Sequence, residues 1–145
     1  MGTIAAAGAT LACSLFAGAA LYITLVEHPA RVRCGTETGV AQFRHSYPRA
    51  ARMQAPLAVA GGLLALAAWL AGEPIGWLAA GGLLAAVVPF TLLIIFPTNH
   101  RLLDRTLDLR AHQTGRLLEG WGRLHFLRTT ASLLSLVGML WLLAG

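Results

Sequence analysis

The chain has 145 residues, of which 57% are hydrophobic and 12% are charged, and its formal net charge is +5. Soluble domains carry roughly 25% charged residues, so this composition excludes an ordinary soluble domain and indicates an integral membrane protein. The positive charge does not indicate nucleic acid binding, because no nucleic-acid-binding motif accompanies it. The two cysteines, Cys13 in an apolar run and Cys34 in a polar connection, do not suggest a disulfide framework.

Four apolar runs are long enough to cross a bilayer, which takes about 20 residues. They lie at about residues 2–26, 54–72, 75–96 and 124–144. Backbone polar groups in lipid must be satisfied within the segment, so each run is predicted to be an α-helix. We therefore expect an all-α protein, an integral membrane four-helix bundle that forms a single transmembrane domain over residues 1–145.

The first run, residues 2–26, has no basic segment before it and is longer than the apolar part of a signal peptide, so we expect it to remain as a helix. Glu27 and His28 stand at its end. Pro29 disfavours helical geometry at His28, which predicts that the first helix ends there. The connection 29–52 contains Gly and Pro residues and is expected to cover one mouth of the bundle.

The second and third runs are joined by the short stretch AGEPIG, residues 71–76, which predicts a tight antiparallel hairpin. The third run ends near Pro97, with Asn99 and His100 just beyond it. Residues 98–116 carry Arg and Asp at helical spacing. This segment is therefore expected either to prolong the third helix or to lie on the membrane surface.

Following the four spans along the chain places all eleven arginines and all five histidines on one side of the membrane and both termini on the other. The positive-inside rule makes the arginine-rich side cytoplasmic, so both termini are predicted on the non-cytoplasmic side. Anionic lipid headgroups are the expected partners of the positive charge. Small residues recur within the first three runs at a spacing that lets helix backbones approach closely.

The fourth run begins with a polar stripe. Trp121, His125 and Arg128 stand at positions i, i+4 and i+7, so they share one helical face, which is expected to turn toward the bundle. Thr24, Glu27 and His28 form a matching set on the first helix. We predict that Glu27 and Arg128 pair or share a hydrogen-bond network, because an unpaired charge at this depth is costly.

Most of these polar residues also have an ordinary structural interpretation. Trp121 alone could be an aromatic-belt anchor, Arg128 could extend to the headgroups, and Asn99 could cap a helix. Glu27 and His28 together are harder to explain in this way, because ionisable groups embedded in a membrane are functional by default. The first, third and fourth helices are thus expected to bring polar groups to one depth at the cytoplasmic end.

Four stretches of the chain carry a further signal: YITLVEHPAR, FRHSYPRAARMQAPLA, PFTLLIIFPTNHRLLD and WGRLHFLRT. Together they resemble the anthrone oxygenase-like family of small four-helix integral membrane proteins, over roughly residues 18–143. The family elements Glu-His-Pro, Pro-x-Asn and Trp-x-x-x-His-x-x-Arg fall on the following residues of this chain: Glu27, His28 and Pro29, then Pro97 and Asn99, then Trp121, His125 and Arg128.

The resemblance implies a membrane-embedded monooxygenase that oxidises an apolar aromatic or phenolic, anthrone-like substrate with molecular oxygen as co-substrate. A neutral histidine, His28 or His125, would remove a proton from a carbon flanked by aromatic rings. Arg128 would hold the developing negative charge, with Asn99 as a second donor. The implied catalytic set is Glu27, His28, Asn99, Trp121, His125 and Arg128.

Two cofactor alternatives remain open at this point. The reaction could proceed without a cofactor, or a single iron or copper ion could be held by His28, His125, His100 and Glu27. No HxxxH or paired-cysteine spacing favours the metal. We expect the lipid bilayer and a small apolar aromatic molecule as partners, in a bacterial inner (plasma) membrane, and both a monomer and a homo-oligomer are compatible with the sequence.

The alternative function is a non-enzymatic membrane module, such as a small partner subunit. In that case the polar residues would form a closed, fully satisfied network with no cavity. A haem-binding bundle is a weaker third alternative, because the histidines are expected at the membrane interface rather than facing one another at depth.

Overall fold

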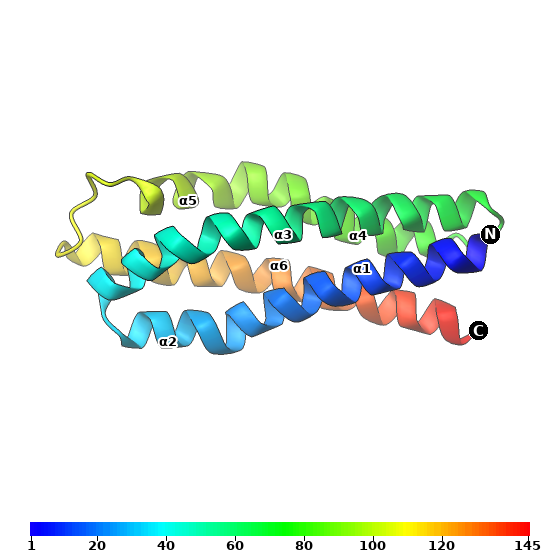
Figure 1. Ribbon diagram of the computed structural model, residues 1–145, viewed down its shortest axis with the longest axis horizontal. Helices are drawn as coiled ribbons and strands as arrows, with labels where there is room; N and C mark the ends of the chain where they lie inside the picture. The colour runs from blue at the N-terminus through cyan, green and yellow to red at the C-terminus, as the bar shows by residue number, and fades with distance from the viewer.

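In the computed structural model, which describes residues 1–145, the chain forms four long helical segments and no strands. Each segment is long and apolar enough to cross a membrane, which confirms the predicted all-α architecture of four membrane-length helices. Figure 1 shows the segments lying side by side, with both termini at one end of the bundle. The segments span Gly2–Arg33, Thr36–Leu70, Gly76–Leu103 and His112–Ala144.

Two of the four segments change from α-helix to π-helix and back. The first consists of α1 (Gly2–Tyr22), η1 (Ile23–Glu27) and α2 (His28–Arg33), and the third of α4 (Gly76–Phe90), η2 (Thr91–Ile95) and α5 (Phe96–Leu103). The other two, α3 (Thr36–Leu70) and α6 (His112–Ala144), are α-helical throughout.

Each π-helix ends two residues before a proline, Pro29 in one segment and Pro97 in the other. A proline inside a helix lacks an N–H donor, and its ring clashes with the carbonyl four residues earlier. The wider turn of a π-helix absorbs this clash, so the helix bends and continues. The expectation that the first helix ends at Pro29 is therefore wrong, and α2 carries it to Arg33.

The helices also extend beyond the apolar runs at the arginine-rich end. Residues 29–52 were expected to be a connection, but α3 begins at Thr36 and contains Pro48 within its length. The third segment is prolonged only to Leu103, and α6 begins at His112, well before the fourth apolar run. Hydrophobicity marks the length needed to cross hydrocarbon, whereas backbone hydrogen bonding continues past that boundary into the polar region.

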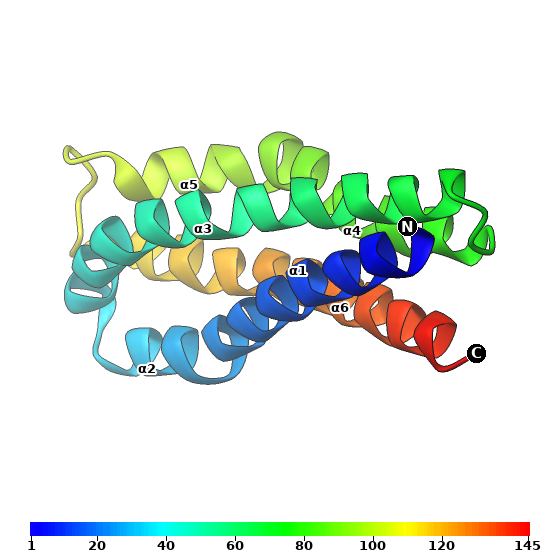
Figure 2. The same cartoon turned by 45° about the vertical axis from the view of Figure 1, so that its right-hand side comes forward.

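The bundle is a ring of antiparallel neighbours in which α1 packs against α3, α3 against α4, α4 against α6, and α6 against α1. Both views show α3 and α4 side by side near the termini, where Gly72 turns the chain between them (Figure 2). The core at this end consists mainly of small residues and the core at the arginine-rich end of larger apolar and aromatic ones. Side-chain size thus increases along the bundle.

Close approach of α3 and α4 depends on glycine. A Cβ atom added at Gly81 would overlap with the Cβ of Ala65, whereas one added at the next residue, Gly82, would meet nothing within 4 Å. Ala65 has no flexible side chain that could move away. The two helices must therefore separate to accommodate any side chain at Gly81.

We predict that Gly81→Ala lowers the free energy of unfolding by about 1–3 kcal/mol, because overpacking forces the backbone apart. Gly82→Ala is the matched control and is expected to be neutral or slightly stabilising, since alanine favours a helix over glycine. Thermal unfolding of both variants in detergent measures the difference. Equal unfolding temperatures for the two variants would contradict this account of the helix contact.

Candidate functional site

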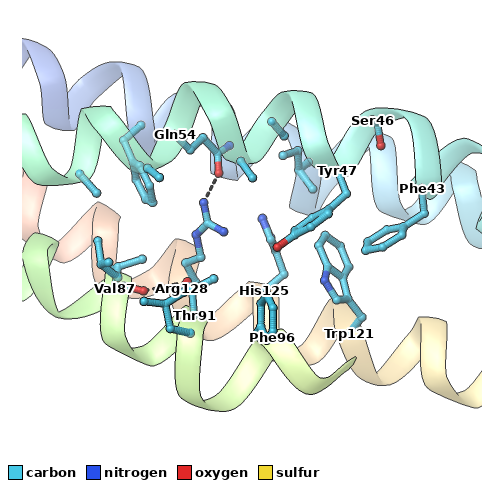
Figure 3. Close-up of a pocket in the computed structure, with 18 of the residues that line it drawn as sticks. Phe43, Ser46, Tyr47, Gln54, Val87, Thr91, Phe96, Trp121, His125 and Arg128 are labelled. Atoms are coloured by element: carbon cyan, nitrogen blue, oxygen red, sulfur yellow. Dashed lines mark hydrogen bonds between the residues drawn. The ribbon is translucent and has the colours of Figure 1, made fainter. Parts of the chain in front are cut away.

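A cavity of about 180 Å³ lies inside the arginine-rich half of the bundle. Its walls come from α3 on one side, from the continuous segment α4–η2–α5 on another, and from α6. The first segment contributes the remaining residues through α1, η1 and α2. Most of the lining is hydrophobic. Figure 3 shows the polar exceptions, among them Gln54 of α3 and Arg128 of α6, which point toward each other across it.

Of the six predicted catalytic residues, Glu27, Trp121, His125 and Arg128 line this cavity. Trp121, His125 and Arg128 are all buried, so their stripe turns toward the bundle as expected. The other two, Asn99 and His28, do not line it. Both touch Trp121, so they adjoin the cavity through that residue.

Asn99 holds two aromatic side chains in place. The Trp121 indole Nε1–H donates to Asn99 Oδ1 at 2.7 Å, and Asn99 Nδ2 donates to the Tyr47 hydroxyl, also at 2.7 Å. The phenyl ring of Phe43 stacks on Tyr47 and meets Trp121 edge-on. Because the Tyr47 oxygen accepts from Asn99, its own O–H is left to donate to another group. Asn99 thus positions Trp121 and Tyr47 rather than contacting the cavity itself.

Glu27 pairs with Arg31 and not with Arg128. The distance between Arg31 Nη2 and Glu27 Oε1 is 2.6 Å, and Gln42 Nε2 donates to the same carboxylate oxygen at 2.7 Å. Arg31 Nη2 also donates to Ser46 at 3.1 Å. The predicted pair of Glu27 and Arg128 is therefore wrong. The physical reason is that the helix continues past Pro29, which brings Arg31 one turn from Glu27 on the same face.

Arg128 is only 8% exposed, and a neutral amide rather than a carboxylate accepts its hydrogen bond. Its guanidinium donates to Gln54 Oε1 and lies 4.9 Å from the centre of the Phe16 ring. Three buried nitrogen atoms of cavity-lining side chains have no hydrogen-bond partner: Arg31 Nη1, Gln54 Nε2 and Arg128 Nε.

The charged side chains that line the cavity are two guanidiniums, those of Arg31 and Arg128, and one carboxylate, that of Glu27. The lining therefore carries a net charge of +1 when all three are ionised. Buried charges and buried N–H groups are costly without partners. A ligand oxygen with negative charge would satisfy both the charge and the free donors.

His125 has a fixed orientation. Its Nδ1 lies 3.1 Å from the Thr24 hydroxyl oxygen, and its ring stacks on Trp121 with 4.8 Å between ring centres. The Thr24 hydroxyl donates to the Ala20 carbonyl at 2.9 Å and lies 2.8 Å from the Thr129 hydroxyl. The Thr24 hydroxyl can thus accept a hydrogen bond from Nδ1–H, an arrangement that leaves His125 Nε2 unprotonated.

His28 packs against Trp121, with 5.3 Å between the ring centres, but it does not line the cavity. Gly122 makes this position available, because a Cβ atom there would overlap with the His28 imidazole. His28 faces a shallow surface hollow that Glu119 and Arg123 also line. Sequence reasoning placed His28 and His125 in equivalent roles, and the structure separates them.

The predicted metal ligands do not come together. The structure contains no group of three or more His, Cys, Asp and Glu side chains placed to hold a metal ion. Glu27 is engaged by Arg31 and Gln42, and His100 is exposed. His125 lines the cavity, whereas His28 lines a separate surface hollow. These residues do not fit an iron or copper site.

Sequence reasoning missed Arg31, Tyr47 and Gln54. Arg31 has the helical i+4 spacing from Glu27, but this spacing predicts a pair only if the helix continues past Pro29. Gln54 is the first residue of the second apolar run and the only residue with a side-chain amide within it. Tyr47 had no comparable signal, because the segment around it was expected to be a connection.

We predict that Gln54→Leu lowers the free energy of unfolding by about 1.5–3 kcal/mol, because it removes the acceptor of a buried charged group. Met53→Leu, at the exposed neighbouring position, is the control and should leave stability unchanged. Thermal unfolding monitored by tryptophan fluorescence compares the two. The pairing of Gln54 with Arg128 would be refuted by a Gln54→Leu protein as stable as the control.

Comparison with known proteins adds one positive finding. The family model described as anthrone oxygenase matches residues 43–138, which is most of the chain. No curated protein and no solved structure matches. The matched range includes Tyr47, Gln54, Asn99 and the stripe on α6, but it begins after Glu27 and Arg31.

Proposed function

Because the chain belongs to the anthrone oxygenase family, we propose that it is a membrane-embedded oxygenase that oxidises an apolar phenolic, anthrone-like molecule with molecular oxygen. The observation that carries the proposal is the cavity: apolar walls, a net positive lining and three unpartnered donors. A flat aromatic molecule that ionises to a phenolate or enolate meets each of these features.

The apolar walls would bind the rings of such a molecule, and the cationic groups would bind its oxygen. Phe16, Phe43 and Trp121 are aromatic lining residues against which a planar ring can pack. Arg128 and Gln54 offer free N–H groups in a buried setting, where a hydrogen bond to an oxyanion is strong. Binding the anion more tightly than the neutral molecule makes the proton on the conjugated CH2 carbon easier to remove.

His125 is the proposed base. Thr24 would hold the proton on Nδ1, so the lone pair on Nε2 can accept a proton from the substrate CH2 group. His28, the other candidate, does not line the cavity and is left out of this role. Glu27 would act on Arg31 rather than on the base, since it pairs with that residue.

The reaction balances with oxygen as the only oxidant. One C–H proton goes to His125, and the resulting carbanion, with its charge shared by the oxygen held by Arg128, forms a C–O bond with O2. The second hydrogen of the carbon then leaves as the O–O bond breaks. The CH2 group becomes C=O with one oxygen atom, and the other oxygen atom leaves as water with the two hydrogens.

We also propose that the whole chain forms one transmembrane domain in a bacterial inner membrane, with the arginine-rich end and the cavity on the cytoplasmic side. The distribution of arginines supports this orientation. Ten of the eleven arginines lie outside the four apolar runs, and Arg128 lies near the arginine-rich end of the fourth run. Apolar substrates that partition into the bilayer would then reach the site from lipid.

The alternative, a purely structural membrane module, requires a closed network with every polar group satisfied. The cavity and its unpartnered donors favour a ligand site over that alternative, because a structural network gains nothing from free buried N–H groups. Under the structural alternative, substitutions in the network would change stability alone.

The enzyme proposal predicts oxygen consumption by detergent-purified protein supplied with anthrone, with one O2 used for each quinone formed. His125→Ala is expected to lower kcat by about 10²–10⁴-fold, the usual contribution of a general base. His100→Ala, at an exposed position outside the cavity, is the matched control. A protein-free reaction must be subtracted, since electron-rich anions react with oxygen unaided. Wild-type protein with no uptake above that background, or undiminished turnover in His125→Ala, would refute the proposal.

The charge of the cavity gives an independent prediction. Gln54→Glu adds a carboxylate beside Arg128 and brings the lining to two carboxylates and two guanidiniums. We expect the free protein to unfold at a higher temperature, because Arg128 gains an ionic partner, and to bind a phenolate at least tenfold more weakly. Calorimetric titration with the phenolate and thermal unfolding measure the two effects. Unchanged affinity would show that the ligand is not held as an anion.

A further inference from the structure

The cavity reaches the outer surface of the bundle between α3 and η2. Leu92 of η2 and Phe96 at the start of α5 line it, yet they are 58% and 50% exposed. On the opposite side, Ala51 and Ala55 of α3 also line it, and Ala55 is exposed as well. A cavity that opens to the outside has exposed side chains at its rim, and among the lining residues Leu92, Phe96 and Ala55 are the most exposed. The opening therefore lies between these four residues.

The π-helix accounts for this opening. α3 packs against α4 before η2 and against α5 after it, but its backbone does not closely approach that of η2. The side of α3 that faces η2 presents alanines, which are too small to fill the space between them. Figure 3 shows this arrangement, with α3 along one wall and the segment carrying Val87, Thr91 and Phe96 along the other.

The opening lies within the apolar part of the third segment. Leu92, Leu93, Ile94 and Phe96 are all at least half exposed, so the surface around it is hydrocarbon in character. In a bilayer this surface contacts acyl chains. The opening thus connects the charged interior of the cavity with the lipid phase rather than with water.

The size of the cavity makes this opening necessary for a large ligand. Its volume of about 180 Å³ is little more than the roughly 150 Å³ that accommodates one benzene ring in an engineered apolar cavity. A fused three-ring molecule cannot be enclosed completely. If its oxygen reaches Arg128 and Gln54, its outer rings must extend toward the surface.

We propose that the space between Ala51, Ala55, Leu92 and Phe96, here called the lateral slot, is the second half of the substrate site and its entrance. It would hold the outer rings of a planar fused-ring phenol whose oxygen binds in the cavity, and it would admit that molecule sideways from the bilayer. This inference rests on the proposed function for the nature of the ligand. The lateral slot would explain where the ligand enters and why phenols with several fused rings bind more tightly than phenols with one ring.

The test compares two ligands that differ only in ring number, phenol and 2-hydroxyanthracene, without oxygen so that nothing is consumed. Ala55→Trp places a bulky side chain in the slot. Val59→Trp is the matched control, one turn further along α3, 47% exposed and outside the cavity lining. Dissociation constants are measured by calorimetric titration of protein in lipid nanodiscs.

We expect Ala55→Trp to raise the Kd of 2-hydroxyanthracene at least tenfold and that of phenol less than twofold, whereas Val59→Trp changes neither by more than twofold. Retained phenol binding also shows that the variant is folded. The slot is refuted if Ala55→Trp weakens both ligands equally or neither, or if wild-type protein does not bind 2-hydroxyanthracene. It is also refuted if Ala55→Trp alters only the amount of phospholipid that copurifies, since acyl chains would then be the occupants.

Oxygen consumption separates this proposal from the previous one. Wild-type protein that binds 2-hydroxyanthracene through the slot but oxidises no anthrone would retain the slot and refute the oxygenase. Protein that oxidises anthrone equally well with Ala55→Trp or Val59→Trp would retain the oxygenase and refute the slot.

Discussion

Two guanidinium groups share an apolar interior with a single carboxylate, and the arrangement of the site follows from this imbalance. A buried charge without a partner is among the most costly features a protein can contain. Glu27 and Gln42 compensate Arg31, but Arg128 has only the carbonyl oxygen of Gln54 and the face of Phe16. Such an incompletely neutralised cation is useful in a reaction that generates an anion, because the guanidinium attracts the substrate oxygen more strongly as negative charge develops on it.

The two π-helices shape the surroundings of this charge. Each precedes a proline, and together they bend the first and third segments on different sides of the bundle. η1 carries Thr24 and Glu27, which contact His125 and Arg31, and η2 leaves the space beside α3 into which the cavity opens. π-helices of this kind are frequent at functional sites. Here the same backbone irregularity serves a polar contact in one segment and an opening in the other.

Much of the fold could be predicted from the sequence, because hydrophobic length determines the number of spans. Periodicity within α6 also identified Trp121, His125 and Arg128 as one buried face. The partners of these residues could not be predicted in the same way. Arg31 comes within reach of Glu27 because the helix continues past Pro29, whereas the proline predicts that the helix ends. Tyr47 and Gln54 were missed because partners across a bundle depend on the rotation of each helix, which local spacing does not specify.

The gradient of side-chain size along the bundle has a consequence for engineering. At the termini, Gly81 and Ala65 allow the backbones of α3 and α4 to touch, while larger side chains hold the helices at the other end. The two helices are therefore close together at the glycine contact and further apart at the other end. A methyl group added at Gly81 would alter the space between the two helical segments at the cavity without touching any bound molecule. Substrate range could then be adjusted from a position remote from the chemistry.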